Sequence, residues 1–72
     1  MPPVPSVPGR KIIRALERHG FKTDRINGSH HVMIHPDGRS TTVPVHGGRD
    51  VPRGTLRGIL RDVGLTVDQL DM

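Results

Sequence analysis

The sequence contains no cysteine, tryptophan or tyrosine, and Phe21 is its single aromatic residue. Without cysteine, the chain has neither a disulfide framework nor the thiolate ligands of a structural zinc site. Without a set of aromatic rings, it has no platform on which successive nucleic-acid bases could stack. A small apolar core, helped if necessary by a partner, must therefore stabilise the fold.

Long apolar runs are also missing from the sequence. No stretch is long enough to cross a bilayer, and the N-terminal MPPVPSVPGRK has prolines where a signal peptide would carry its apolar segment. We therefore expect a cytoplasmic protein with no membrane association. A chain of 72 residues buries only about 60% of the surface that its unfolded form exposes. We expect one domain over residues 1–72, of which residues 1–8 form an extended, proline-rich lead-in.

Positive charge exceeds negative charge, and the excess is uneven along the chain. Eleven Lys and Arg against seven Asp and Glu give a formal net charge of +4. Three of the acidic residues, Asp62, Asp68 and Asp71, lie in the last eleven positions, so residues 1–61 carry eleven bases against four acids, a net of +7. This excess favours a partner rich in phosphate, although a surface charged only for solubility is the alternative.

Two segments have apolar residues at helical spacing. The first predicts a helix over residues 9–19 with Gly20 as its stop, and the second predicts a helix that ends at Gly64. Their apolar positions are Ile12, Ile13 and Leu16, and Leu56, Ile59, Leu60 and Val63. Their outer faces carry basic stripes, Arg10, Arg14 and Arg18 on the first and Arg53, Arg57 and Arg61 on the second. Thr66 and Gln69 have the spacing of a capping box for one last helical turn.

Between the two helices, segments rich in β-forming residues alternate with turn signals. Asn27-Gly28 and Asp37-Gly38 are typical of two-residue hairpin turns, because type I′ turns need positive φ at both central positions. Three antiparallel strands follow from these turns. We therefore predict an α+β fold with the order α-β-β-β-α, in which a three-stranded antiparallel sheet carries two helices on one face and leaves the other face open.

The two turns also set a strand register. With Asn27-Gly28 as the first turn, Arg25 lies opposite His30, and with Asp37-Gly38 as the second, His30 lies opposite Val45. The predicted core face then holds Phe21, Thr23, Val32, Ile34, Thr41, Val43 and Val45, with Arg25 and His30 at its end. The predicted open face holds Lys22, Asp24, Ile26, Ser29, His31, Met33, His35, Ser40, Thr42 and Pro44.

Histidines 19, 30, 31, 35 and 46 are the candidates for chemistry. On this register, partial burial and the neighbouring Arg25 would both lower the pKa of His30, which would then suit a general base. A histidine satisfied by a local hydrogen bond at the strand edge is the plainer alternative. His31 would point to the open face and contact a ligand, and His46 would emerge beside His30 as a candidate second proton-handling group.

Metal and cofactor chemistry are not indicated by the sequence. Adjacent strand positions point to opposite faces, so His30 and His31 cannot easily bind one ion, and no clustered carboxylates complete a ligand set. No P-loop, dinucleotide fingerprint or nucleophile elbow occurs. His19, at the end of the first helix, and His35, near the second turn, are expected to have no chemical role. We therefore expect no metal and no cofactor.

Several short motifs follow one another in a specific order after the proline-rich lead-in. They are Gly20-Phe21, Gly28-Ser29-His30-His31, His35-Pro36-Asp37-Gly38-Arg39, Val43-Pro44, His46-Gly47, Pro52, Gly54-Thr55-Leu56, Ile59-Leu60 and Gly64-Leu65. In this order and spacing, the chain resembles the HicA family of toxin mRNA interferases. The resemblance implies a fold like that of a double-stranded-RNA-binding domain, cleavage of mRNA independently of the ribosome, and a HicB-type antitoxin encoded beside the toxin. It also implies that the first histidine after Gly-Ser, here His30, is catalytic.

On that resemblance we expect a metal-independent endoribonuclease, a hydrolase acting on RNA. His30 would act as the general base on the ribose 2′-hydroxyl, a nucleophile that DNA lacks. From register and loop placement alone, Arg25 would stabilise the charged phosphorane, and His46 or water would supply the acid for the leaving group. The residues expected to contact RNA are Gly28, Ser29, His31, Arg49, Arg53 and Arg57. A noncatalytic RNA-binding or interaction module is the main alternative, and a metal-dependent hydrolase is the third.

Overall fold

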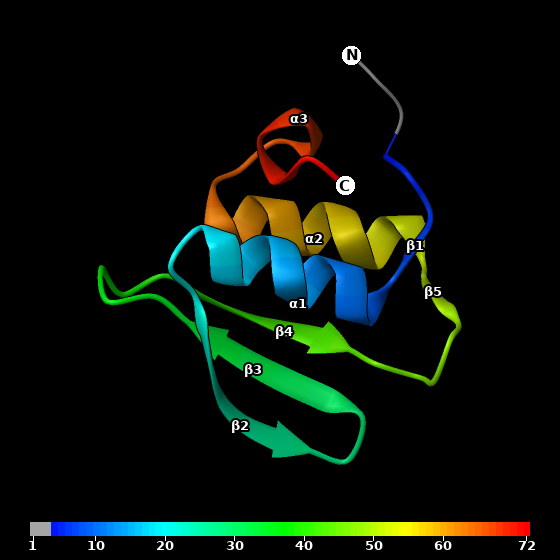
Figure 1. The fold of residues 1–72 in the computed structure, drawn as a ribbon, viewed down its shortest axis with the longest axis horizontal. Coiled ribbons are helices and arrows are strands. Elements are labelled where there is room, and N and C mark those ends of the chain that lie inside the picture. The colour runs from blue at the N-terminus through cyan, green and yellow to red at the C-terminus, as the bar shows by residue number, and fades with distance from the viewer. Residues whose placement is uncertain (1–3) are drawn as a thin grey trace.

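The predicted order α-β-β-β-α is present in the computed structural model, which describes residues 4–72 (Figure 1). Helix α1 (Gly9–Arg18) precedes strands β2 (Lys22–Asn27), β3 (His30–Ile34) and β4 (Ser40–Pro44), and helix α2 (Arg53–Val63) follows them. Three shorter elements complete the fold, namely strands β1 (Val7–Pro8) and β5 (Asp50–Val51) and the last helical turn α3 (Val67–Leu70). The predicted α+β class is confirmed.

The helices form where the sequence places apolar residues on one face and a stop signal behind them. The buried positions are Gly9, Ile12, Ala15 and Leu16 in α1, and Leu56, Ile59, Leu60 and Val63 in α2. Gly20 (φ 91°) and Gly64 (φ 68°) follow the two helices with a backbone that glycine adopts without steric cost. At α3, the Thr66 hydroxyl accepts from the Gln69 N–H and the Gln69 side chain accepts from the Thr66 N–H. The predicted helices and capping box are therefore confirmed.

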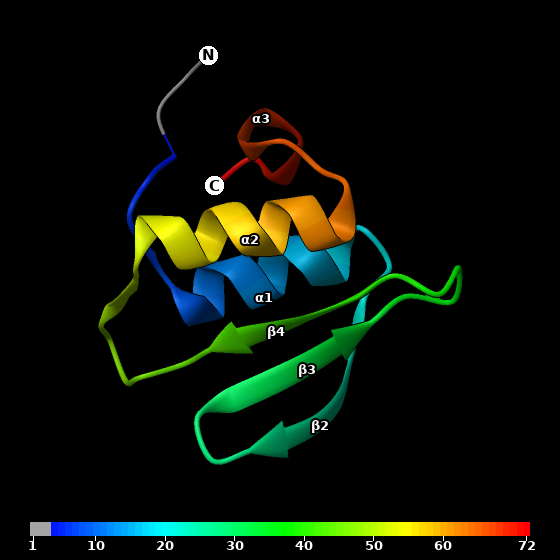
Figure 2. The same cartoon turned by 180° about the vertical axis from the view of Figure 1, so that it is seen from behind.

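Both helices lie on one side of the sheet, and they cover it unevenly. The sheet is antiparallel with the order β2-β3-β4. In the views from both sides, α1 and α2 lie over β4, and the β2–β3 hairpin projects beyond them (Figure 1, Figure 2). Consistently, every residue of β2 is exposed. The hairpin therefore keeps part of its helix-facing side open.

The strand register differs by one residue from the prediction. The first turn consists of Gly28 and Ser29, so His30 pairs with Asn27 and His31 pairs with Ile26. Gly28 has φ 59°, whereas Ser29 has a negative φ. A glycine with positive φ at the first central position is the requirement of a type II′ turn, and the predicted type I′ turn at Asn27-Gly28 is wrong.

On its other side, β3 pairs with β4 across a longer connection than the predicted two-residue turn. The loop runs from residue 35 to 39, and the His35 N–H donates to the Arg39 C=O (2.9 Å). His30 consequently pairs with Pro44 and not with Val45. The two register errors cancel at β4, so that Thr41 and Val43 lie in the core as predicted.

At β3 the errors do not cancel, because one residue of register moves every side chain to the other face. Met33, predicted on the open face, is fully buried, and Ile34, predicted in the core, is 41% exposed. In β2, a bulge between Thr23 and Arg25 makes room for Asp24. The bulge keeps Thr23 opposite Met33 on the helix-facing side. The predicted burial of Phe21 is confirmed.

The last two residues of the predicted lead-in belong to the folded structure. Val7 pairs with Val51 and Pro8 pairs with Asp50, which makes β1 and β5 a second, two-stranded antiparallel sheet. Both valines are buried in the core. Residues 1–3 of the predicted lead-in lie outside the described residues. The extended conformation predicted for residues 7 and 8 is therefore part of a strand pair.

Candidate functional site

His30 is the first residue of β3 and lies on the open face of the sheet. Its neighbours across the ladder are Asn27 and Pro44, and its side chain is exposed. The predicted partial burial and the predicted place opposite Arg25 are both wrong, because the turn is shifted by one residue. Within residues 4–72, no hydrogen bond or ion pair involves the His30 imidazole. The ring is thus available to a ligand on the open face.

Arg25 lies opposite Val32, which is on the same face of β3 as His30. Arg25 and His30 are therefore diagonal neighbours across the β2–β3 ladder, at a Cα spacing of about 7–8 Å that a long side chain can span. Arg25 is exposed. The two residues are thus diagonal neighbours and not a directly opposed pair, but both lie on the same face of the sheet.

The turn before His30 is tied to the segment after β4. The Val45 N–H donates to the Ser29 C=O (2.7 Å), which extends the β3–β4 ladder beyond its last residue pair. His46 follows Val45 and is exposed, so it stands at the same end of the sheet as His30. Its C=O accepts from the Arg49 N–H (3.1 Å) in the turn that leads to β5.

His31 points to the opposite side of β3 and is half-buried, so its predicted place on the open face is wrong. It lines an open cleft of about 390 Å³ between α1 and the inner side of the β2–β3 hairpin. Residues of the hairpin, of α1 and of the segment after β4 form its walls: Arg10, Ile13, Arg14, Glu17, Thr23, Ile26, His31 and Val45. The cleft exists because the helices cover β4 and leave the hairpin projecting.

The arginines predicted to contact RNA are exposed and gather at one end of the molecule. Figure 1 shows the loop between β4 and β5, the start of α2 and the β2–β3 turn at the same end, on the right. Arg49 lies in that loop, Arg53 opens α2 and Arg57 follows one turn later. The exposed turn glycine Gly28 lies at this end too.

The predicted basic stripe of α1 is divided. Arg10 and Arg14 line the cleft. Arg18 instead donates to the Leu70 C=O (2.9 Å), and the neighbouring His19 ring nitrogen lies 2.8 Å from the Gln69 C=O. These two contacts hold α3 against the end of α1. His19 therefore has a structural contact that the sequence did not indicate.

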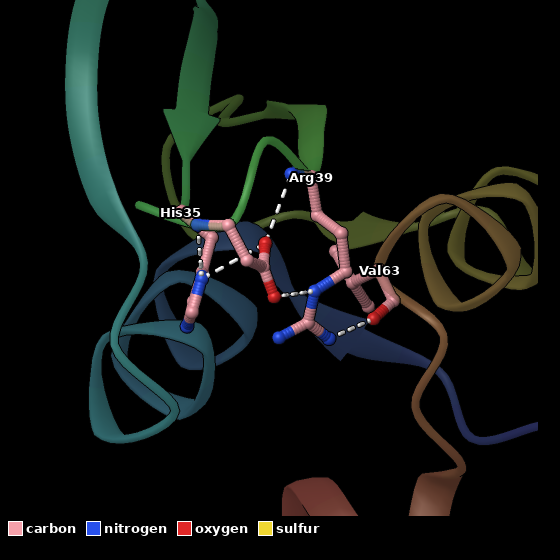
Figure 3. A network of polar contacts seen from close by, with 4 residues as sticks. His35, Arg39 and Val63 are labelled. Atoms are coloured by element: carbon pink, nitrogen blue, oxygen red, sulfur yellow. Dashed lines mark hydrogen bonds and ion pairs between the residues drawn. The ribbon is translucent and has the colours of Figure 1, made fainter.

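His35, predicted to be an exposed strand residue, is half-buried within a polar network at the β3–β4 loop (Figure 3). Its ring packs edge-on against Phe21, with 5.0 Å between centroids. Its Nδ1 lies 3.1 Å from the Asp37 backbone N and 2.9 Å from the Asp37 carboxylate, so it accepts from the former or, when protonated, donates to the latter. The network fastens the loop and lies apart from His30 along β3.

The same network perturbs one carboxyl group. The Arg39 backbone N–H donates to Asp37, and this hydrogen bond, reinforced by the Arg39 side chain, lowers the pKa of the Asp37 carboxyl below its usual value. The Arg39 guanidinium also lies over the Phe21 ring and donates to the Val63 C=O at the end of α2. Asp37 and Arg39 thus tie the loop to the second helix, which is a structural role.

Among residues 4–72, no three His, Cys, Asp or Glu side chains are grouped so as to hold a metal ion. Within the same residues, no helix is long and apolar enough to cross a membrane.

Comparison with protein families agrees with the fold. The family described as "HicA toxin of bacterial toxin-antitoxin" matches residues 9–65, from the start of α1 to the residue after Gly64. No curated protein matches the chain. The family match spans the helix, the sheet and the second helix on which His30, the cleft and the exposed arginines lie. This chain belongs to the HicA toxin family.

Proposed function

We propose that this toxin is a metal-independent endoribonuclease that cleaves single-stranded mRNA in the cytoplasm and is neutralised by a HicB-type antitoxin. Membership of a toxin-antitoxin family supports the toxic role and an antitoxin partner. The observation that carries the ribonuclease proposal is the position of His30. His30 is the first residue of a regular strand and directly follows a tight turn; its imidazole is exposed, and Arg25 lies on the same face of the sheet.

In the proposed reaction, His30 accepts the proton of a ribose 2′-hydroxyl. The 2′-oxygen then attacks the adjacent phosphorus, the bond from phosphorus to the 5′-oxygen breaks, and the leaving oxygen takes a proton from His46 or water. Imidazole suits such proton transfer near neutral pH. Arg25 stabilises the extra negative charge on the phosphorane. DNA is not cleaved, because it lacks the attacking hydroxyl.

The remaining exposed groups at this end of the molecule bind the substrate. Arg49, Arg53 and Arg57 provide contacts to phosphates, and the Gly28–Ser29 turn lets the RNA backbone approach His30 closely. His31 contacts RNA from the cleft on the other side of β3.

Purified protein incubated with single-stranded RNA in EDTA tests the proposal. Wild type should cleave, and His30→Ala should cleave about 10² to 10⁴-fold more slowly, because it lacks one acid-base group. His19→Gln is the matched control, since this histidine lies near α3 and glutamine can keep its contact with the Gln69 C=O. Equal cleavage by His30→Ala would contradict the assignment of His30.

The other two hypotheses give different results in the same assay. Binding of RNA without cleavage would favour a noncatalytic RNA-binding module, because the exposed arginines serve binding equally well. Cleavage that stops in EDTA and returns with a divalent metal would favour a metal-dependent hydrolase.

A further inference from the structure

The cleft between α1 and the β2–β3 hairpin has a composition that suits one kind of ligand. We propose that it binds a phosphodiester group of the RNA chain through Arg10 and Arg14, with the adjoining ribose against its apolar wall. The choice of RNA as the ligand rests on the proposed ribonuclease function. The cleft would then extend the substrate site from the open face of β3 to its other side.

The α1 wall of the cleft is a single helical stripe. Ile13 and Arg14 lie three and four residues after Arg10, and Glu17 lies four and three residues after them, which places all four on one face. Arg10 and Arg14, one turn apart, are like charges that weaken a helix slightly. Bound phosphate would relieve their repulsion. Guanidinium groups also match the oxygens of a phosphate in geometry.

The charge at the Arg10 end of this stripe is not neutralised among the described residues. Glu17 is the one acidic residue of the stripe, and it lies three residues after Arg14 but nearly two turns from Arg10; Asp71 lines a second hollow with Arg14. Among residues 4–72, neither Arg10 nor Arg14 forms an ion pair within 4.0 Å, since the ion pairs found there join Asp37 to His35 and Arg39. The first turn of α1 also contains no acidic residue. The Arg10 end of the cleft therefore attracts an anion.

The opposite wall supplies apolar surface beside these charges. Ile26 is 56% exposed and pairs directly with His31, whose imidazole faces the same cleft. Val45, after β4, and Ile13, on the α1 wall, are half-buried and add to this apolar surface. A few convergent polar groups beside an apolar surface are typical of small-ligand sites. A nucleotide offers this pairing, a charged phosphate next to the less polar face of a sugar.

Continuity with His30 favours RNA over an acidic peptide. His30 and His31 are consecutive residues at the start of β3, one on each side of the sheet. A single-stranded polyanion that passes over the β2–β3 turn can reach both sides. The two arginines of α1 would then hold a phosphate at a fixed place relative to the nucleotide on the open face.

Binding of an uncleavable ligand by the full chain tests this site. The probe is a single-stranded oligouridine with 2′-O-methyl groups, which lacks the nucleophile, and its affinity is measured by fluorescence anisotropy over a range of salt concentrations. Arg10→Gln and Arg14→Gln should each weaken binding about two- to fivefold at low salt. Each should also reduce the slope of log affinity against log salt by about 0.7, the value for one phosphate contact on a single strand.

Lys11→Gln is the matched control, because it removes the same charge from the same helix without touching the cleft. It should change affinity less than either arginine variant. Arginine variants that bind like wild type, or a Lys11→Gln variant that binds as weakly as they do, would overturn the proposal. Tighter binding of hexaglutamate than of the oligonucleotide, lost in the same arginine variants, would overturn it in favour of a peptide site.

A direct readout is the imidazole of His31. In NMR titrations with the oligonucleotide, the ring signals of His31 should shift, and those of His19, held near α3, should not. The outcomes also separate this proposal from the ribonuclease proposal. If binding depends on Arg10 and Arg14 but ordinary RNA is not cleaved, the cleft proposal stands and the ribonuclease proposal is wrong. If RNA is cleaved but the affinity for the oligonucleotide does not depend on Arg10 or Arg14, the ribonuclease proposal stands and the cleft proposal is wrong.

Discussion

At the scale of single residues, the two neighbouring histidines differ in their surroundings. His30 is exposed on the open face, whereas His31 is half-buried in the cleft with two arginines. The strand geometry alone makes this difference, because successive side chains of a strand point to opposite faces. Alanine at each position should therefore affect different steps, with loss of rate at His30 and loss of affinity at His31.

Gly9 is a residue that a side chain cannot replace without strain. A Cβ at this position would overlap the carbonyl oxygen of Pro44 and press on Val45, where α1 begins against the end of β4. We expect Gly9→Ala to destabilise the protein by about 1–3 kcal/mol, as overpacking does in well-packed interiors. Urea or thermal unfolding followed by circular dichroism measures this change.

Gly58→Ala is the control for Gly9→Ala. Gly58 lies within α2, and a Cβ there would meet no atom within 4 Å. Alanine should stabilise the helix by about 0.5–1 kcal/mol, because glycine loses more conformational freedom on folding. If Gly9→Ala leaves the melting temperature unchanged or raises it, the close approach of Gly9 to Pro44 does not restrict that position.

Asp37 makes the stability of the protein depend on pH in the acid range. Its pKa is lowered in the folded state, chiefly because the Arg39 backbone N–H donates to it. A carboxyl group with a depressed folded pKa contributes stability above its unfolded pKa of about 3.9, and the contribution is lost as the pH falls through the folded value. Asp37→Asn should therefore lower stability at neutral pH and flatten the acid loss of stability below about pH 4. Thermal unfolding of wild type and Asp37→Asn over a range of acid pH values measures the two profiles.

At the scale of elements, the strand register decides which side of β3 faces the core. Met33 is fully buried and Ile34 is 41% exposed. Met33→Ala should cost about 2–5 kcal/mol, as for other truncations of large core side chains, and Ile34→Ala should cost much less. Chemical denaturation of the two variants gives the free energies of unfolding. A larger loss of unfolding free energy for Ile34→Ala than for Met33→Ala would instead support the register in which Asn27-Gly28 forms the first turn.

The elements themselves could be predicted from local patterns, and the register could not. Apolar spacing and stop glycines are local signals, and they predicted both long helices and the capping box at Thr66. In β3, Val32, Met33 and Ile34 are all apolar, so no alternation of polar and apolar residues indicates the buried face. The turn signal was ambiguous too, because Gly28 serves a type I′ turn after Asn27 and a type II′ turn before Ser29.

Features that depend on contacts between distant parts of the chain could not be predicted from the sequence either. The pairing of Val7 with Val51 joins two short segments that lie far apart in the sequence. The cleft depends on how far the helices stand from the β2–β3 hairpin, which local patterns do not encode. The exposed place of His30 at the end of the sheet follows from the same one-residue shift. By contrast, the arginine spacing of α1 marked the stripe whose first two members line the cleft.

At the scale of the whole molecule, exposed basic residues lie at the same end as His30. The β2–β3 turn, the loop after β4 and the start of α2 lie together there (Figure 1). Residues 1–61 carry eleven basic and four acidic residues, whereas the last eleven carry three acidic and none that is basic. The acidic α3 is held at the other end of α1 by Arg18 and His19. A polyanion approaching the protein is therefore drawn toward the end that carries His30.

This arrangement predicts how the protein behaves in a cell. Induced expression of wild type should arrest growth and deplete total mRNA, and His30→Ala should do neither, because binding without proton transfer leaves the RNA intact. If the proposed antitoxin partner is correct, co-expression of a HicB-type antitoxin should restore growth of cells that make wild type. His30→Ala should still form a complex with that antitoxin, as size-exclusion chromatography of the mixed proteins would measure, because an exposed side chain is not needed for folding. Growth arrest by His30→Ala as strong as by wild type would mean that toxicity arises from binding alone, and the catalytic role of His30 would be wrong.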